Sequence, residues 1–147
     1  MFKSILVPID LAHRSSWEHA LPQAIDLAEA SHGSIKLVTV VRDLKTAFEG
    51  TFFPFQLEMM ISEAEAKLRE IISNHSVKNA TFSEEVLFGS IGRDIVHAAK
   101  KYNADLIVMA SHRPEVKDYF IGPNAAYVAQ HALCSVLVVR VPADLVH

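Results

Sequence analysis

Runs of apolar residues, separated by polar segments, predict five strands along the chain. Ile5, Leu6 and Val7 are consecutive, and the other runs are also apolar with little alternation. Such runs are typical of strands that are buried on both faces, as parallel sheets require. The predicted strands span residues 4–9, 35–41, 82–87, 106–110 and 136–139.

Apolar residues at helical spacing predict four helices between these strands. The clearest spans 56–74, and its apolar stripe consists of Leu57, Met60, Ile61, Ala64, Leu68, Ile71 and Ile72. A second helix spans 91–102, with Ser90 as its expected N-cap. A third begins directly after Gly122.

The first helix carries less consistent signals. Ser15 or Ser16 can cap it, with Glu18 in the first turn. Pro22 removes a backbone hydrogen bond, which predicts a bend or a late start. Gly33 is the expected C-terminal cap.

The segment 42–55 is irregular and contains Gly50, Pro54 and three phenylalanines. We interpret it as a loop folded over the edge of the core, or else as a lid or dimer contact. Strands that alternate with helices predict a parallel sheet with helices on both faces. The weak strand 82–87 contains Glu84 and Glu85, which favours a sheet edge.

Composition narrows the possible functions. The chain has 147 residues, a length that favours a single domain spanning residues 1–147. Its formal charge of -3 argues against a protein that binds nucleic acid independently of sequence. Cys134 is the single cysteine, so no internal disulfide can form, and we expect a reducing, cytoplasmic setting. Pro8 and Asp10 interrupt the first apolar run, so we expect neither a signal peptide nor a membrane span.

The turn after the fourth strand is a candidate phosphate site. A strand, a glycine and a helix start in succession, and free backbone N–H groups then point towards one place. The amides of Asn124 and Ala125 are the expected donors. Pro123 suits the first helical position but contributes no N–H group.

Asp10 follows the first strand and has two interpretations. Its carboxylate can accept hydrogen bonds from a ribose or adenine group or partner a metal, or it can cap a nearby loop. Cys134 is interpreted as a core residue. The histidines lack zinc-hydrolase spacing, and the chain has no P-loop motif.

Three segments resemble one known family. Ala110-Ser111-His112-Arg113-Pro114 followed by Gly122-Pro123-Asn124-Ala125-Ala126 resembles the nucleotide-binding turn of the universal stress protein family, most closely its F-type bacterial branch. The opening Ile5-Leu6-Val7-Pro8-Ile9-Asp10 and the closing segment from His131 to Arg140 are similar to it as well. The resemblance implies a single-domain, Rossmann-like α/β fold with strand order 3-2-1-4-5. In that order the ligand crevice opens at the C-terminal ends of strands 1 and 4.

The resemblance also implies a nucleotide site, in which the backbone at Val40 pairs with adenine. The implied site residues are Pro8, Ile9, Asp10, Val40, Met109, Ala110, Ser111, His112, Arg113, Gly122, Pro123, Asn124 and Ala125. Ala110 and Arg113 stand where the family has glycines, the loop is one residue shorter, and Pro123 replaces a serine or threonine. Arg113 can compensate by gripping a phosphate, or it is a solvated loop charge. Ser111 and His112 can add donors, and His112 can instead pack against the loop.

The expected function is a stress-response regulator or nucleotide-gated interaction module that binds ATP, ADP or AMP. We assign no catalytic residue and no dedicated metal site, and we expect at most slow ATP hydrolysis, with Mg²⁺ arriving through bound phosphates. The resemblance further implies a homodimer formed by the strand from Val136 to Val139. The alternative is a dimeric interaction protein that binds no nucleotide.

Overall fold

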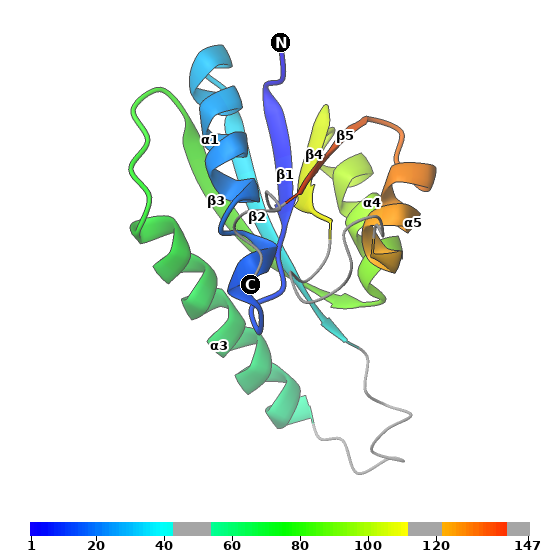
Figure 1. The fold of residues 1–147 in the computed structure, drawn as a ribbon. Helices are drawn as coiled ribbons and strands as arrows, with labels where there is room; N and C mark the ends of the chain where they lie inside the picture. The colour runs from blue at the N-terminus through cyan, green and yellow to red at the C-terminus, as the bar shows by residue number, and fades with distance from the viewer. Residues whose placement is uncertain (43–53, 112–121, 141–147) are drawn as a thin grey trace.

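A computed structural model describes residues 1–42, 54–111 and 122–140. Its centre is one five-stranded parallel sheet with the order β3-β2-β1-β4-β5, as the family resemblance implied (Figure 1). The strands are β1 (Ser4–Pro8), β2 (Ser34–Arg42), β3 (Thr81–Gly89), β4 (Leu106–Ala110) and β5 (Ser135–Val139). The helices are α1 (Ala20–Ser31), α3 (Pro54–Ser73), α4 (Ile91–Lys101) and α5 (Pro123–His131).

Helices cover both faces of the sheet, as predicted. One core cluster joins Ile5, Ile35 and Leu37 to buried residues of α1 and α3, and a second joins Leu6 and Val38 to buried residues of α4 and α5. Successive side chains of a strand point to opposite faces. A nearly continuous apolar run therefore supplies both clusters, which explains the consecutive Ile5, Leu6 and Val7 of β1, all of them buried.

The order in which strands are added to the sheet changes side at β1. From β1 the chain builds outward through β2 to β3, and then crosses back to place β4 on the other side of β1. The β1–β2 register runs as far as Pro8 and the β4–β5 register as far as Ala110, whereas β1 and β4 are in register at Ile5 and Leu6. In open α/β sheets, ligands bind beyond the C-terminal ends of strands at such a reversal.

Of the local predictions about helix starts, the late start of α1 is confirmed and two serine caps are wrong. α1 begins at Ala20 after a 3-10 turn over Arg14–Ser16, and Pro22 therefore falls in the first turn, where its missing N–H removes no helical bond. Ser16 does not cap α1, because its hydroxyl is engaged with the backbone of Asp10. Ser90 precedes α4 as predicted, but its hydroxyl makes no capping bond; the Asp94 carboxylate accepts the Ser90 N–H instead, at 2.5 Å.

The C-terminal end of α1 uses a different residue from the one expected. His32, with φ of 55°, takes the left-handed conformation that was expected of Gly33. Gly33 is required for another reason: a Cβ there would lie 2.8 Å from the Lys3 carbonyl oxygen. The absence of a side chain at Gly33 therefore lets the start of β2 pass close to the start of β1.

β3 lies at the sheet edge, as its glutamates indicated. Val40 lies two residues before the end of β2, which extends one residue beyond the predicted strand at each end. The interpretation of 42–55 as a loop or lid falls largely outside the described residues. Among the helices that the structure describes, none is long and apolar enough to cross a membrane.

Candidate functional site

The end of β1 is held firmly against β2. The Ile9 N–H donates to the Val38 carbonyl oxygen at 2.8 Å, and the buried Thr39 hydroxyl donates to the Ile9 carbonyl oxygen at 3.0 Å. Pro8 and Ile9 are themselves buried. Thr39 thus fixes the end of β1, although its role was not predicted from the sequence. Its signal was one hydroxyl within the apolar run from Leu37 to Val41.

Asp10 forms a compact turn directly after this strand. Its carboxylate accepts the Ala12 N–H at 2.9 Å and lies 2.9 Å from Nδ1 of His13. The Asp10 N–H donates to the Ser16 hydroxyl at 2.8 Å, and that hydroxyl donates to the Asp10 carbonyl oxygen at 3.0 Å. Asp10 therefore serves as a loop cap here, while 56% of its side chain stays exposed.

The end of β4 is tied directly to the start of α5. The Ser111 N–H donates to the Val139 carbonyl oxygen at 3.1 Å, and the Gly122 N–H donates to the Ser111 carbonyl oxygen at 2.9 Å. Ser111 and Gly122 are both buried. This pair of bonds fixes the N-terminus of α5 at the same edge of the sheet as the end of β4.

The N-terminus of α5 has the features of an anion site. Pro123 occupies the first turn, no acidic residue lies there, and Ala125 is buried while Asn124 is exposed. Within the described residues, Ala126 is the first amide of this helix with a backbone acceptor, the Gly122 carbonyl oxygen at 3.0 Å. The amides of Asn124 and Ala125 precede it, at the positive end of the helix dipole.

The remaining expected residues that the structure describes lie on β4 and on β2, the two neighbours of β1 in the sheet. Met109 and Ala110 pair with Val138 and Val139 of β5 on the β4 side. Val40 pairs with Leu87 of β3 and packs against the core cluster that joins the sheet to α4 and α5. His112 and Arg113 lie outside the described residues.

Two groups of expected residues thus share one edge of the sheet. Pro8, Ile9 and Asp10 follow β1, whereas Ser111 and Gly122 join β4 to α5. Because parallel strands end at the same edge, the loop carrying Asp10 and the start of α5 lie at the edge where such folds bind ligands. The arrangement can present backbone amides to an anion and backbone carbonyls to a base.

Comparison with known proteins agrees with the resemblance drawn from sequence. The model of the universal stress protein family matches residues 1–140. Universal stress protein G of Salmonella typhimurium is 30% identical over 145 residues, covering 95% of this chain and 100% of that protein. A homologue of this name agrees with the resemblance to the F-type branch.

Solved structures show the same fold. Universal stress protein UspA from Lactobacillus plantarum superposes with a TM-score of 0.73 at 22% identity, covering 95% of this chain and 98% of that one. A universal stress protein in complex with cAMP has a TM-score of 0.63 at 19% identity, covering 95% and 97%. A family protein from Arabidopsis thaliana with AMP bound has a TM-score of 0.64 at 14% identity, covering 97% and 94%. Given the family match over residues 1–140, this chain belongs to the universal stress protein family.

Proposed function

We propose that this protein binds an adenine nucleotide in the crevice beyond β1 and β4, and acts in the cytoplasm as a stress-response regulator whose shape or assembly depends on that ligand. The observation that carries the proposal is the hydrogen bond from the Gly122 N–H to the Ser111 carbonyl oxygen, at 2.9 Å. It fixes the positive end of α5 at the edge where such folds bind ligands. The AMP-bound and cAMP-bound relatives support the choice of ligand.

Each side of the crevice has a distinct role in the proposal. The amides of Asn124 and Ala125 bind phosphate oxygens, because they lie at a helix N-terminus without an acidic neighbour in its first turn. Backbone groups of Pro8, Ile9 and Val40 face the base. The Asp10 carboxylate accepts a ribose hydroxyl once it leaves the bonds to Ala12 and His13.

The nucleotide acts as a ligand rather than as a consumed substrate. Efficient phosphoryl transfer requires a bound metal and a placed water. In the part of the chain that the structure describes, no group of three His, Cys, Asp or Glu side chains could hold a metal ion. Mg²⁺ would therefore arrive with the phosphates of ATP.

Assembly through β5 is the expected output. β5 lies at the sheet edge, where its backbone groups can pair with a second chain. Leu133, just before it, is 85% exposed, and Leu137 is 37% exposed. Antiparallel pairing of Val136 to Val139 with the same strand of a second copy would cover this apolar edge. Light scattering of the purified protein at micromolar concentration would give a dimer mass, and a monomer mass would contradict this pairing.

The second candidate is an interaction protein that binds no nucleotide. Two observations favour it: the Asp10 carboxylate is already engaged by its own turn, and Pro123 supplies neither an N–H nor a hydroxyl at the start of α5. In this alternative the β5 edge carries the function alone.

Calorimetric titration with AMP, ADP and ATP separates the two candidates. We expect saturable binding to the wild-type protein, weaker binding to Asp10→Ala, and stronger binding to Pro123→Ser, which restores a hydroxyl. Asp26→Ala, on the exposed face of α1, is the matched control and should bind like wild type. A folded dimer that binds none of the three nucleotides would establish the second candidate instead.

A further inference from the structure

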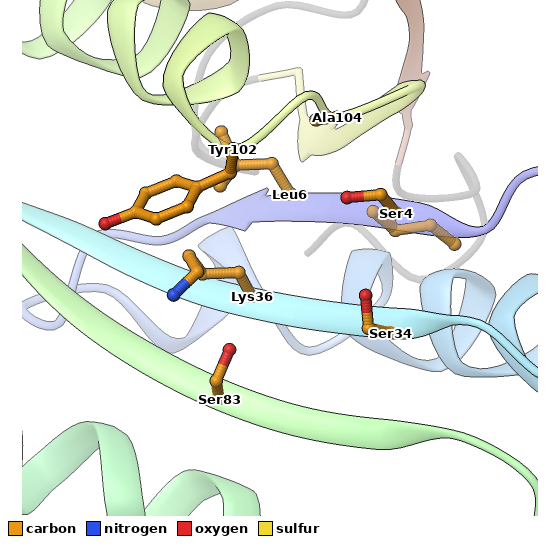
Figure 2. Close-up of a pocket in the computed structure, with 8 residues that line it drawn as sticks. Ser4, Leu6, Ser34, Lys36, Ser83, Tyr102 and Ala104 are labelled. Carbon is orange, nitrogen blue, oxygen red and sulfur yellow. The ribbon is translucent and has the colours of Figure 1, made fainter.

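A hollow of about 220 Å³ lies at the opposite end of the sheet from the crevice. It opens at the starts of β1, β2 and β3, below the residues that follow α4, as Figure 2 shows. Its chemistry comes from Ser4, Leu6, Ser34, Lys36, Ser83 and Tyr102. No residue of the nucleotide crevice contributes to it.

Strand register brings the polar side chains together. Ser4 is in register with Ser34, and Leu6 with Lys36, across the β1–β2 ladder. Lys36 is in register with Ser83 across the β2–β3 ladder. Register partners point to the same face of a sheet, so three hydroxyls and one ammonium group gather on the α4 side. In Figure 2 the hydroxyls of Ser4 and Ser34 lie near each other, and Ser83 lies close to Lys36 on the same face of the sheet.

The hollow is open to solvent, since Ser34 and Ser83 are exposed and Ser4 and Lys36 are half-buried. The rest of β1 and β2, the interior strands of the sheet, is largely apolar on both faces. On the opposite face of β2, Ile35 and Leu37 are fully buried. Ser34 and Lys36 therefore break the apolar pattern on one face only, where the hollow lies.

The Lys36 ammonium group lies over an aromatic ring and, among the described residues, has no carboxylate as an ion-pair partner. Its Nζ lies 4.1 Å from the centroid of the Tyr102 ring, and Nζ of Lys101 lies 5.3 Å from the same centroid. The Tyr102 hydroxyl donates to the Glu85 carboxylate, which directs that hydroxyl and carboxylate towards each other. Among the described residues, Lys36 forms no ion pair within 4.0 Å.

The hydroxyls also retain donor capacity. Ser34 makes one long contact, 3.4 Å to the Lys3 carbonyl oxygen. For the described part of the chain, no side-chain hydrogen bond of Ser4 or Ser83 is recorded. The Asp105 carboxylate near Ser4 is occupied by the backbone N–H groups of Lys3 and Ser4, at 2.9 and 3.0 Å.

We propose that this hollow is a second ligand site, which takes a small oxyanion with the chemistry of phosphate. Lys36 supplies the charge, Ser4, Ser34 and Ser83 supply hydroxyl donors, and the Tyr102 ring fixes the ammonium group. Charge-assisted hydrogen bonds to oxyanions are the stronger kind. The volume of about 220 Å³ is below the roughly 300 Å³ at which drug-sized pockets begin, which favours a small anion over a whole nucleotide. The ligand is a free anion or the terminal phosphate of a small metabolite.

Titration of the isotope-labelled protein with inorganic phosphate, followed by amide chemical shifts, tests the site. Sodium chloride at matched ionic strength is the reference, and glycerol 3-phosphate distinguishes a free anion from a phosphomonoester. We expect saturable shifts of the Ser34, Lys36 and Ser83 amides. Lys36→Met keeps an apolar stem over Tyr102 and should weaken binding about tenfold or more. Lys101→Met, the matched control, should bind within about twofold of wild type.

The same data can overturn the proposal. Equal shifts with chloride, shifts confined to the amides of Gly122 to Ala125, or equal affinities of wild type and Lys36→Met would each do so. A Ser34→Ala, Ser83→Ala double variant guards against a folding defect in Lys36→Met. The double variant should also bind phosphate more weakly than wild type, and unchanged affinity would show that these hydroxyls do not contact the anion.

Discussion

Asp105 joins the starts of β1 and β4, the two strands beyond whose C-terminal ends the proposed nucleotide site lies. Its carboxylate accepts the Lys3 N–H at 2.9 Å and the Ser4 N–H at 3.0 Å, and its own N–H donates to the Ser4 carbonyl oxygen at 2.9 Å. The residue before β4 is thus bonded to the first residues of β1. Asp105→Ala removes both side-chain bonds and leaves the backbone bond intact.

The expected loss follows from the exposure of the two donors. A hydrogen bond to a charged group contributes about 1.5–3 kcal/mol to the free energy of unfolding. The bond to Lys3 is exposed, so water replaces it at little cost, whereas the bond to Ser4 is partly buried. Asp105→Ala should therefore destabilise by about 2 kcal/mol, and Asp105→Asn, which keeps one acceptor, by about 1 kcal/mol.

Urea unfolding followed by circular dichroism measures this loss. A change of about 2 kcal/mol corresponds to a fall in Tm of about 4–8 °C for a domain of this size. Asp26→Ala, on the exposed face of α1, controls for the loss of one carboxylate and should stay within about 0.5 kcal/mol of wild type. A loss in Asp105→Ala no greater than in this control would show that the two bonds do not hold β1 and β4 together.

Three further predictions concern other contacts. The hydrogen bond to Glu85 raises the pKa of Tyr102 to about 12, so this bond stabilises the fold below about pH 10 and its contribution is lost as the pH rises towards 12. Ultraviolet titration of tyrosinate should show the late ionisation of Tyr102, and Glu85→Gln should move the pKa of Tyr102 back towards 10. Burial raises the pKa of the Cys134 thiol, so a disulfide reagent at neutral pH should modify it more slowly in the folded than in the urea-unfolded protein, and equal rates would contradict this. Gly89, with φ of +142°, faces the Asp94 carboxylate, and Gly89→Ala should cost roughly 1–3 kcal/mol in urea unfolding, whereas an unchanged midpoint would argue against strain there.

Apolar pattern predicted the fold better than it predicted the ends of its elements. Every strand and helix appeared where the runs indicated, because parallel strands buried on both faces leave a strong signal. The capping of α1 could not be predicted, because the Ser16 hydroxyl bonds to the backbone of Asp10, six residues earlier, instead of capping a helix. The strand order came from the family resemblance, since right-handed crossovers alone leave several orders open.

The site was only partly accessible from sequence. The positions of Asp10 at the end of β1 and of Gly122 before α5 followed from the pattern, but the bond between Gly122 and Ser111 joins residues that are far apart in sequence and could not be predicted. The hollow around Lys36 was missed altogether. Its signal was a polar residue at alternate positions, Ser34 and Lys36, of a strand expected to be apolar on both faces.

Amide chemical-shift mapping with AMP tests the central claim most directly. The account predicts saturable shifts at Gly122, Asn124 and Ala125 and in the turn from Asp10 to His13, on the two sides of one crevice. Lys36 and Ser83, at the opposite end of the sheet, should stay unchanged by AMP. Saturable shifts that avoid the start of α5, or no shifts at millimolar AMP in the folded protein, would contradict it.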